Sequence, residues 1–219
     1  MQTHFEMELA GLKEKLLAMG SCAEVAVSKA MRAVIVRDGN LARDVCDADD
    51  TMDSYEIEID DMSIHLLAKA PLATDLRLIT VAMKISQNLE RVGDEATTIS
   101  RRALELNKEP QLKAYVDVPR MAGIALEMLK SALDAFVHKE PEKALAIIAR
   151  DKEVDEINRH LHRELSSYMI EDPTTITRCL NLMVVCKSLE RIADHATNIA
   201  EEVVYLYEAR DVRHAGGIL

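Results

Sequence analysis

Apolar residues recur near the start of the chain at steps that alternate between four and three. This spacing places them on one face of an α-helix whose other faces are charged. Gly39-Asn40 follows and is expected to end the helix, with Asn40 as the N-cap of the next helix. The apolar face consists of Phe5, Leu9, Leu12, Leu16, Met19, Ala23, Ala26, Ala30 and Ala33.

Two further helices are predicted in the first half of the chain. The second has its apolar face over residues 41–66 and stops before Pro71, and the third covers residues 78–106 and stops before Pro110. Proline disfavours a helical conformation in the residue that precedes it, so both boundaries follow from the sequence. Long helices joined by short turns predict an antiparallel three-helix bundle.

The same pattern is written a second time. It restarts after the segment LNKEPQLKAYVDVP, which holds two prolines and has no apolar face. Residues 121–135 then match 19–33, and Pro173 occupies the position of Pro71. An internal duplication explains this agreement, so we expect an all-α fold of two tandem, pseudo-symmetric, spectrin-repeat-like three-helix bundles. The expected division is a first repeat at 1–109, a linker at 110–118, a second repeat at 119–210 and a tail at 211–219.

The amino-acid composition is typical of packed helices, and the net charge limits the classes of partner that the protein could bind. The chain of 219 residues has no Trp and only 3% aromatic residues, whereas strands depend on aromatic and β-branched side chains. A formal net charge of −11 argues against nucleic-acid binding and leaves cations and basic protein surfaces as partners. There is no apolar run of about 20 residues and no signal peptide, so we expect a cytoplasmic protein without membrane insertion.

A pair of acidic residues occurs in both halves of the chain, along with the repeated apolar positions. The chain contains NLERVGDEATTI near residue 90 and SLERIADHATNI near residue 190, so Glu90 and Asp94 correspond to Glu190 and Asp194. Residues four apart share one face of a helix, with Cβ atoms about 5–6 Å apart. A repeated core explains the leucine and isoleucine of each copy but not the acids.

The helix before each of these segments carries a matching pair of acids. These are Asp49 and Asp53 in the first half and Asp151 and Asp155 in the second. Four carboxylates from two adjacent helices form an oxygen-rich, negative site suited to Mg²⁺, Mn²⁺ or iron, or to zinc if a histidine joins. We therefore predict one cation site in each half of the chain.

Other interpretations of these residues remain open. The acids could form a solvated face whose surface ion pairs with Arg91, Arg191 and Lys187 contribute little. His195 could accept a phosphoryl group, although its counterpart in the first half is Glu95. No catalytic motif, phosphate-binding loop or ferritin-like Glu-x-x-His pair is present, so we do not expect an enzyme.

The twin LERVGD and LERIAD segments, each preceded by a helix with Asp-x-x-x-Asp, resemble the PhoU family of phosphate-uptake regulators. The resemblance spans essentially the whole chain. It implies two symmetry-related three-helix bundles that carry multinuclear iron or zinc clusters, or other divalent ions, on the acidic motifs. The ligands that it implies are Asp49, Asp53, Glu90, Asp94, Asp151, Asp155, Glu190 and Asp194.

The resemblance also implies a negative regulator of the phosphate-starvation response. PhoU-like proteins work in the cytoplasm, often as dimers, with the ATPase subunit of the Pst phosphate ABC transporter and with a PhoR-type sensor histidine kinase. We therefore expect an adaptor between transporter and kinase. The alternatives are a histidine phosphotransfer protein, a metal-handling helical protein and a purely structural helical oligomer.

Overall fold

The computed structural model describes residues 4–70, 72–112 and 117–212, and within these ranges it contains helices and no strands. The all-α prediction is therefore confirmed. No described helix combines the length and the apolar character that crossing a membrane requires. The helices are α1 (His4–Val36), α2 (Gly39–Asp47), α3 (Asp49–Leu67), α4 (Ala73–Leu106), α5 (Asp117–His138), α6 (Pro141–Glu171), the 3₁₀ turn η1 (Pro173–Thr175) and α7 (Ile176–Glu208).

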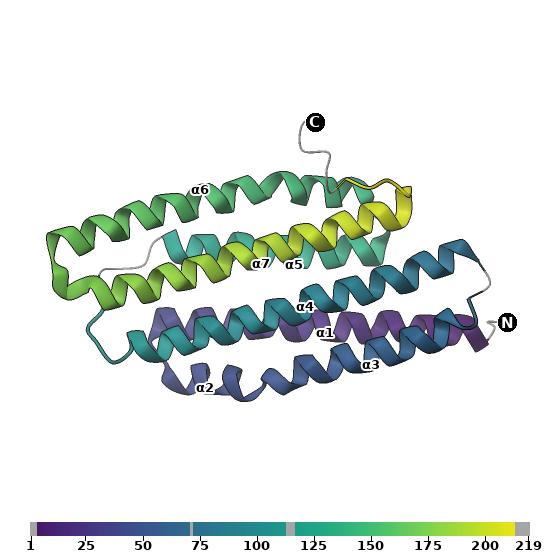
Figure 1. Ribbon diagram of the computed structural model, residues 1–219, viewed down its shortest axis with the longest axis horizontal. Helices are drawn as coiled ribbons and strands as arrows, with labels where there is room; N and C mark the ends of the chain where they lie inside the picture. Colours follow the sequence, from purple (N-terminus) through teal and green to yellow (C-terminus); the bar gives the residue numbers. More distant parts are fainter. Residues whose placement is uncertain (1–3, 71, 113–116, 213–219) are drawn as a thin grey trace.

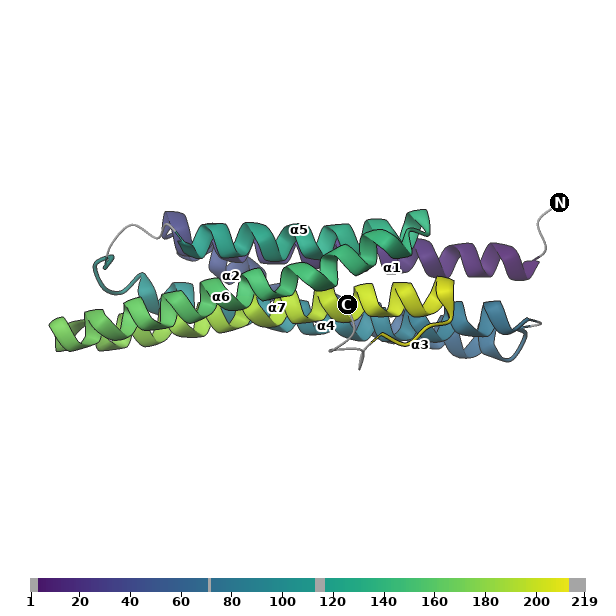
Figure 2. The same cartoon turned by 90° about the horizontal axis from the view of Figure 1, so that it is seen from above.

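The helices form two groups that lie side by side. Helices α1 to α4 form one group and α5 to α7 the other, with α4 and α7 running antiparallel at the centre of the molecule (Figure 1). The second view shows that α1 and α5 lie on one side, whereas α3, α4, α7 and α6 lie on the other (Figure 2). The predicted tandem bundles are thus present, and they pack against each other along their lengths.

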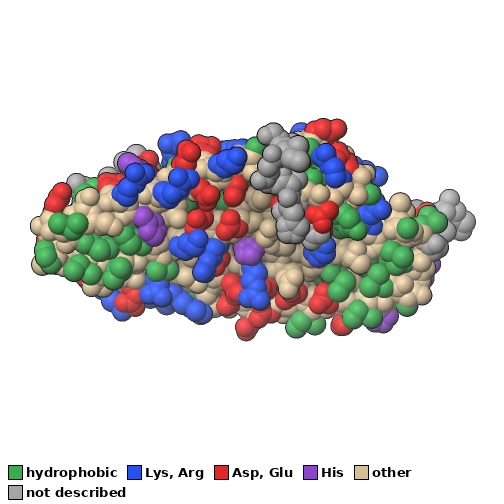
Figure 3. Space-filling view, turned by 45° about the horizontal axis from the view of Figure 1, so that its top comes forward, with side chains coloured by type: hydrophobic (Ala, Val, Ile, Leu, Met, Phe, Trp, Pro, Cys, Tyr) green, Lys and Arg blue, Asp and Glu red, His purple; other side chains and the backbone are tan. Residues whose placement is uncertain are grey.

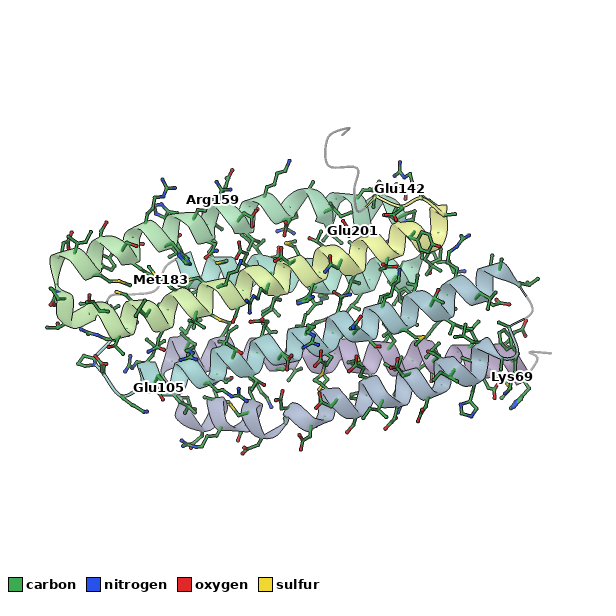
Figure 4. The ribbon with its side chains drawn as sticks, viewed as in Figure 1. Lys69, Glu105, Glu142, Arg159, Met183 and Glu201 are labelled. Carbon is green, nitrogen blue, oxygen red and sulfur yellow. The ribbon has the colours of Figure 1, made fainter. Side chains whose placement is uncertain are left out.

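A single hydrophobic core runs through both groups. It includes fully buried residues of α1 and α4, such as Leu16 and Ile85, and of α5 and α7, such as Leu129 and Leu189. Side chains of α4 and α7 fill the space between these two central helices (Figure 4). The first and second repeats are therefore halves of one packed body.

One part of the helix prediction is wrong. The second helix, expected as one element over residues 41–66, is interrupted at Ala48, where φ is −92° and ψ is 2°. These angles lie outside the α-helical region, so α2 ends at Asp47 and α3 begins at Asp49. The apolar spacing continues across the break, so periodicity alone did not detect it.

The cap between α1 and α2 also differs from the prediction. The N-cap is Asp38, whose Oδ1 accepts hydrogen bonds from the backbone N–H groups of Asn40 at 2.8 Å and Leu41 at 3.3 Å. Arg37 has a φ of 59°, which turns the chain so that Asp38 is the residue in the extended conformation that an N-cap requires.

The predicted boundaries between repeats fall partly outside the described residues. Residues 113–116 of the expected linker and 213–219 of the expected tail lie there. Helix α4 ends at Leu106 and α5 begins at Asp117, inside the expected linker of 110–118. The division into repeats, linker and tail stays a prediction.

Gly20 permits a close approach of α1 to α5. A Cβ atom at this position would lie 2.6 Å from Leu133 Cδ1, whereas a Cβ at Gly123, on the exposed side of α5, would have no atom within 4 Å. We expect Gly20→Val to lower the free energy of unfolding by about 1–3 kcal/mol, because the added atoms overpack the contact between the repeats. Urea unfolding measures this effect, with Gly123→Val as control. Equal midpoints for the two variants would contradict the assigned contact.

Candidate functional site

Different sides of residues 89–95 of α4, the LERVGD segment and the Glu95 that follows it, face different neighbours. Leu89 and Val92 are fully buried in the core. Glu90 lies beside acids of α3, whereas Glu95 points to the other repeat, where Arg191 Nη1 of α7 donates to its Oε1 at 3.0 Å. Because successive residues of a helix are about 100° apart, one short segment serves the core, an acidic site and the interface between the repeats.

The first acidic site lies between α3 and α4. The half-buried Glu90 has a raised pKa, first because burial disfavours its charge and then because Asp94, Glu56 and Asp53 add negative potential. Burial, followed by Asp60, raises the pKa of Glu56 in the same way. The structure therefore brings Glu90, Asp94 and Asp53 together, as predicted, and adds Glu56 and Asp60. These two continue the acidic face of α3, which the spacing of Asp49 and Asp53 had indicated.

Asp49 lies at the edge of this site. Its Oδ1 accepts a hydrogen bond of 2.9 Å from Thr97 Oγ1, one turn of α4 beyond Asp94. Asp49 and Asp94 both line the same surface cleft. We use "first acidic site" for Asp49, Asp53, Glu56, Asp60, Glu90 and Asp94.

The second acidic site lies between α6 and α7 and contains all four predicted acids. Burial, followed by Asp155, raises the pKa of Asp151, although the neighbouring Thr197 hydroxyl acts in the opposite direction. Burial, Asp151 and Glu190 raise the pKa of Asp194 to about 6. These mutual effects show that Asp151, Asp155, Glu190 and Asp194 occupy one electrostatic cluster.

Sequence reasoning missed two polar residues near this cluster. Asn158 and His162 follow Asp151 and Asp155 along one face of α6, at the positions that Glu56 and Asp60 hold on α3. Asn158 Oδ1 and His162 Nε2 are buried without a hydrogen-bond partner. Aligning the two repeats beyond the Asp-x-x-x-Asp pairs would have placed Asn158 and His162 opposite Glu56 and Asp60.

Cations already accompany the acids, as the solvated-face interpretation expects. Arg91 Nη1 donates to Asp94 Oδ2 at 3.0 Å, and Lys187 forms an ion pair with Glu190. Arg91 Nε lies 3.2 Å from Glu90 Oε2, but this buried oxygen accepts no hydrogen bond. The first acidic site therefore contains a buried oxygen that is ion-paired with Arg91 but accepts no hydrogen bond.

The donor set suits hard cations, but the carboxylates are spread out. All eight predicted ligands supply oxygen, which is the ligand atom that Mg²⁺, Ca²⁺ and Mn²⁺ prefer. In the described part of the chain, however, no three of their oxygens lie within 4.8 Å of one another. An ion would have to draw the side chains together or complete its coordination with water.

His195 does not belong to the second acidic site. Its Nδ1 lies 2.9 Å from Asn88 Oδ1 of α4, and Asn198 Nδ2 donates to the same oxygen at 3.2 Å. Burial lowers the pKa of His195 more than Glu95 raises it. The difference between Glu95 and His195 therefore concerns the interface between the repeats, and it does not distinguish the two acidic sites.

Asp49 and Asp94 of the first acidic site and Asp194 of the second line one polar cleft of about 610 Å³ over α4 and α7. Figure 3 shows acidic, basic and histidine side chains mixed over the middle of one face, with hydrophobic side chains gathered towards its ends. A partner bound over the cleft would contact both repeats at once. The cleft is lined by Asp49, Arg91, Asp94, Glu95, Thr97, Thr98, Arg101, Arg191, Asp194, His195 and Asn198.

Comparison with known proteins identifies relatives of the whole chain. The family model described as the PhoU domain matches twice, at residues 16–103 and 118–203. A phosphate-specific transport system accessory protein PhoU homolog of Pseudomonas aeruginosa is 42% identical over 97% of this chain and 88% of its own length.

Two solved structures agree in fold. The crystal structure of PhoU from Pseudomonas aeruginosa has a TM-score of 0.92 and 41% identity, covering 94% of this chain and all of that one. The phosphate transport system regulatory protein PhoU from Streptococcus pneumoniae has a TM-score of 0.90 and 30% identity, covering 95% of this chain and 99% of that one.

The raised pKa of Asp194 predicts a pH-dependent stability in metal-free protein. The pKa is about 6 when folded against an ordinary value of 3.8, so folding is favoured while Asp194 is protonated, and this contribution is lost as the pH rises from about 4 to about 6. We expect Asp194→Asn to gain stability over the parent in this window. The gain near neutral pH is under about 1 kcal/mol, because Asp194 is only partly covered by its neighbours and water screens its charge.

Urea unfolding in chelator at several pH values measures this gain. Asp61→Asn, which removes an exposed acid of α3, controls for the change in net charge. The same dependence on pH in both variants would refute the coupling of Asp194 to its neighbours.

Proposed function

The chain belongs to the PhoU family, and we propose that it is a cytoplasmic negative regulator of the phosphate-starvation response and of phosphate uptake. In this proposal the protein forms a homodimer. It acts as an adaptor between the ATPase subunit of the Pst phosphate ABC transporter and a PhoR-type sensor histidine kinase. Family membership over both repeats is the observation that carries the proposal.

The arrangement of the acidic sites supports an adaptor. Acids of both sites, Asp49, Asp94 and Asp194, line the cleft over α4 and α7, so a basic surface of a partner could engage the two repeats together. Arg91, Arg101 and Arg191 lie between the acids and offer complementary groups for carboxylates of the partner. Such mixed charges favour specific orientation and fast association.

Metal ions are the second part of the proposal. In the first acidic site the buried Glu90 Oε2, with Asp53 and Asp94, would hold a divalent cation, and Asp151, Asp155, Glu190 and Asp194 would do so in the second. The oxygen ligands favour Mg²⁺, Mn²⁺ or iron, and clusters of iron or zinc would require several bridging carboxylates. Bound ions would relieve the repulsion that raises the pKa values of these acids.

Histidine phosphotransfer is a weaker candidate. His195 is half-buried, and its Nδ1 lies against Asn88, so only Nε2 could accept a phosphoryl group without displacing this contact between the repeats. A metal-handling role without partners would depend on the same acids, and a purely structural role would not depend on them at all. These alternatives can be separated by metal binding and by the reporter test below.

Metal binding is tested by removing the acids of each site separately. We expect Glu90→Gln/Asp94→Asn to abolish Mn²⁺ binding in the first repeat, and Glu190→Gln/Asp194→Asn to abolish it in the second, because each pair supplies half of the ligands. Isothermal titration and elemental analysis of untagged protein measure the change. Asp47→Asn/Asp50→Asn, which removes two exposed acids of the first half, is the control with the same change in charge.

One result of the Mn²⁺ measurements would contradict the proposal that the acids bind metal. If both site variants retain the Mn²⁺ stoichiometry of the parent and of the control, the acids do not bind metal. They then form a solvated face, with ion pairs such as Arg91–Asp94.

The regulatory role is tested with a phosphate-responsive reporter. We expect deletion of the gene to release the reporter in phosphate-rich medium and the intact gene to restore repression, because an adaptor carries the signal from transporter to kinase. A chain that carries both Glu90→Gln/Asp94→Asn and Glu190→Gln/Asp194→Asn would show whether repression depends on the acidic sites. This comparison separates the regulatory role from metal binding. Repression that persists after deletion would disprove the regulatory role.

A further inference from the structure

A separate group of metal-binding side chains lies between α5 and α6. Asp117 is the first residue of α5, and His160 and Glu164 are four apart and share one face of α6. One potential ligand atom from each of the three residues lies within 4.8 Å of the others. Within the described ranges, this is the only set of three His, Cys, Asp or Glu side chains that meets so closely.

We propose that Asp117, His160 and Glu164 form a binding site for Zn²⁺. One imidazole nitrogen and two carboxylate oxygens are ligands that zinc accepts, and three protein ligands leave a fourth position for water. This donor set differs from the all-oxygen acidic sites between α3 and α4 and between α6 and α7. The site contains none of the residues assigned to them.

The surroundings favour ion binding. Tyr168 donates its hydroxyl to Glu164 Oε1, which fixes the orientation of this carboxylate as an outer-shell partner does in zinc sites. Asp117 and His160 also line a surface hollow of about 300 Å³ together with Glu153, Glu156 and Arg120, and Arg120 pairs with Glu153 at 3.1 Å. The acids that line the hollow outnumber this arginine, so the hollow favours a hydrated cation.

Access to the site is open. His160 is exposed, whereas Asp117 and Glu164 are half-buried, so the ligands are partly held but still reach solvent. The neighbouring Arg159 points away from the body of the molecule (Figure 4).

A bound ion would link two consecutive helices through residues that are far apart in sequence. Asp117 begins α5 directly after the connection between the repeats, and the other two ligands lie in the C-terminal half of α6. Zn²⁺ would therefore fix the start of the second repeat and stabilise the folded state, since an ion that binds only the folded chain raises its stability.

The test is a Zn²⁺ titration of full-length protein in which both acidic sites are removed by Glu90→Gln/Asp94→Asn/Glu190→Gln/Asp194→Asn. In this background we expect one equivalent of Zn²⁺ to bind, measured by competition with a chromophoric chelator. His160→Ala should weaken binding at least about 100-fold, since losing a ligand costs more than the roughly 10–100-fold of an outer-shell change. His138→Ala, which removes another exposed histidine, is the control.

A second measurement keeps the result independent of folding. In the parent protein, Zn²⁺ should shift the imidazole ¹⁵N resonances of His160 and leave those of His138 unchanged. Absence of a bound equivalent, equal affinity in the two histidine variants, or unshifted His160 resonances would each overturn the proposal. None of these outcomes bears on the regulatory function, because the reporter experiment does not involve these residues.

Discussion

The antiparallel packing of α4 against α7 is the contact on which the rest of the structure depends. It contains buried and half-buried polar pairs as well as apolar residues: Lys84 donates to Glu202 at 3.0 Å, and Arg191 donates to Glu95 at 3.0 Å. A buried charge without its partner is costly, so these pairs favour a single alignment of the helices. That alignment joins the repeats into one body and brings acids of both acidic sites to the same cleft.

This contact also explains the repeated phrase in the sequence. In both repeats the leucine belongs to the core and the acids four residues apart belong to an acidic site, whereas the residues at 91, 95, 191 and 195 lie in or beside the cleft between the repeats. A helix that must satisfy three neighbours leaves little freedom in its sequence. The similarity of the two segments thus reflects three requirements and not only a shared core.

Much of the fold and part of the site could be predicted from the sequence. Apolar periodicity identifies a helix wherever one face is buried, but it could not reveal the break at Ala48, because the apolar spacing continues through it. The acids at 90 and 94 were recognised because they are repeated, whereas Glu56 and Asp60 were not assigned to a site. The partner of His195 and the meeting of Asp117 with His160 depend on how separate helices pack, which no local pattern encodes.

The central interface has the geometry of a dimer contact in which two identical surfaces meet. As residue numbers rise along α4, the numbers of their partners fall along α7, from Glu202 opposite Lys84 to Asn181 opposite Arg102. In a dimer of identical chains, a substitution alters both copies of such a contact together. Covalent fusion removes this constraint. One half here has Glu95 and the other has His195, so the fused chain can vary one side of the contact while the other holds the halves together.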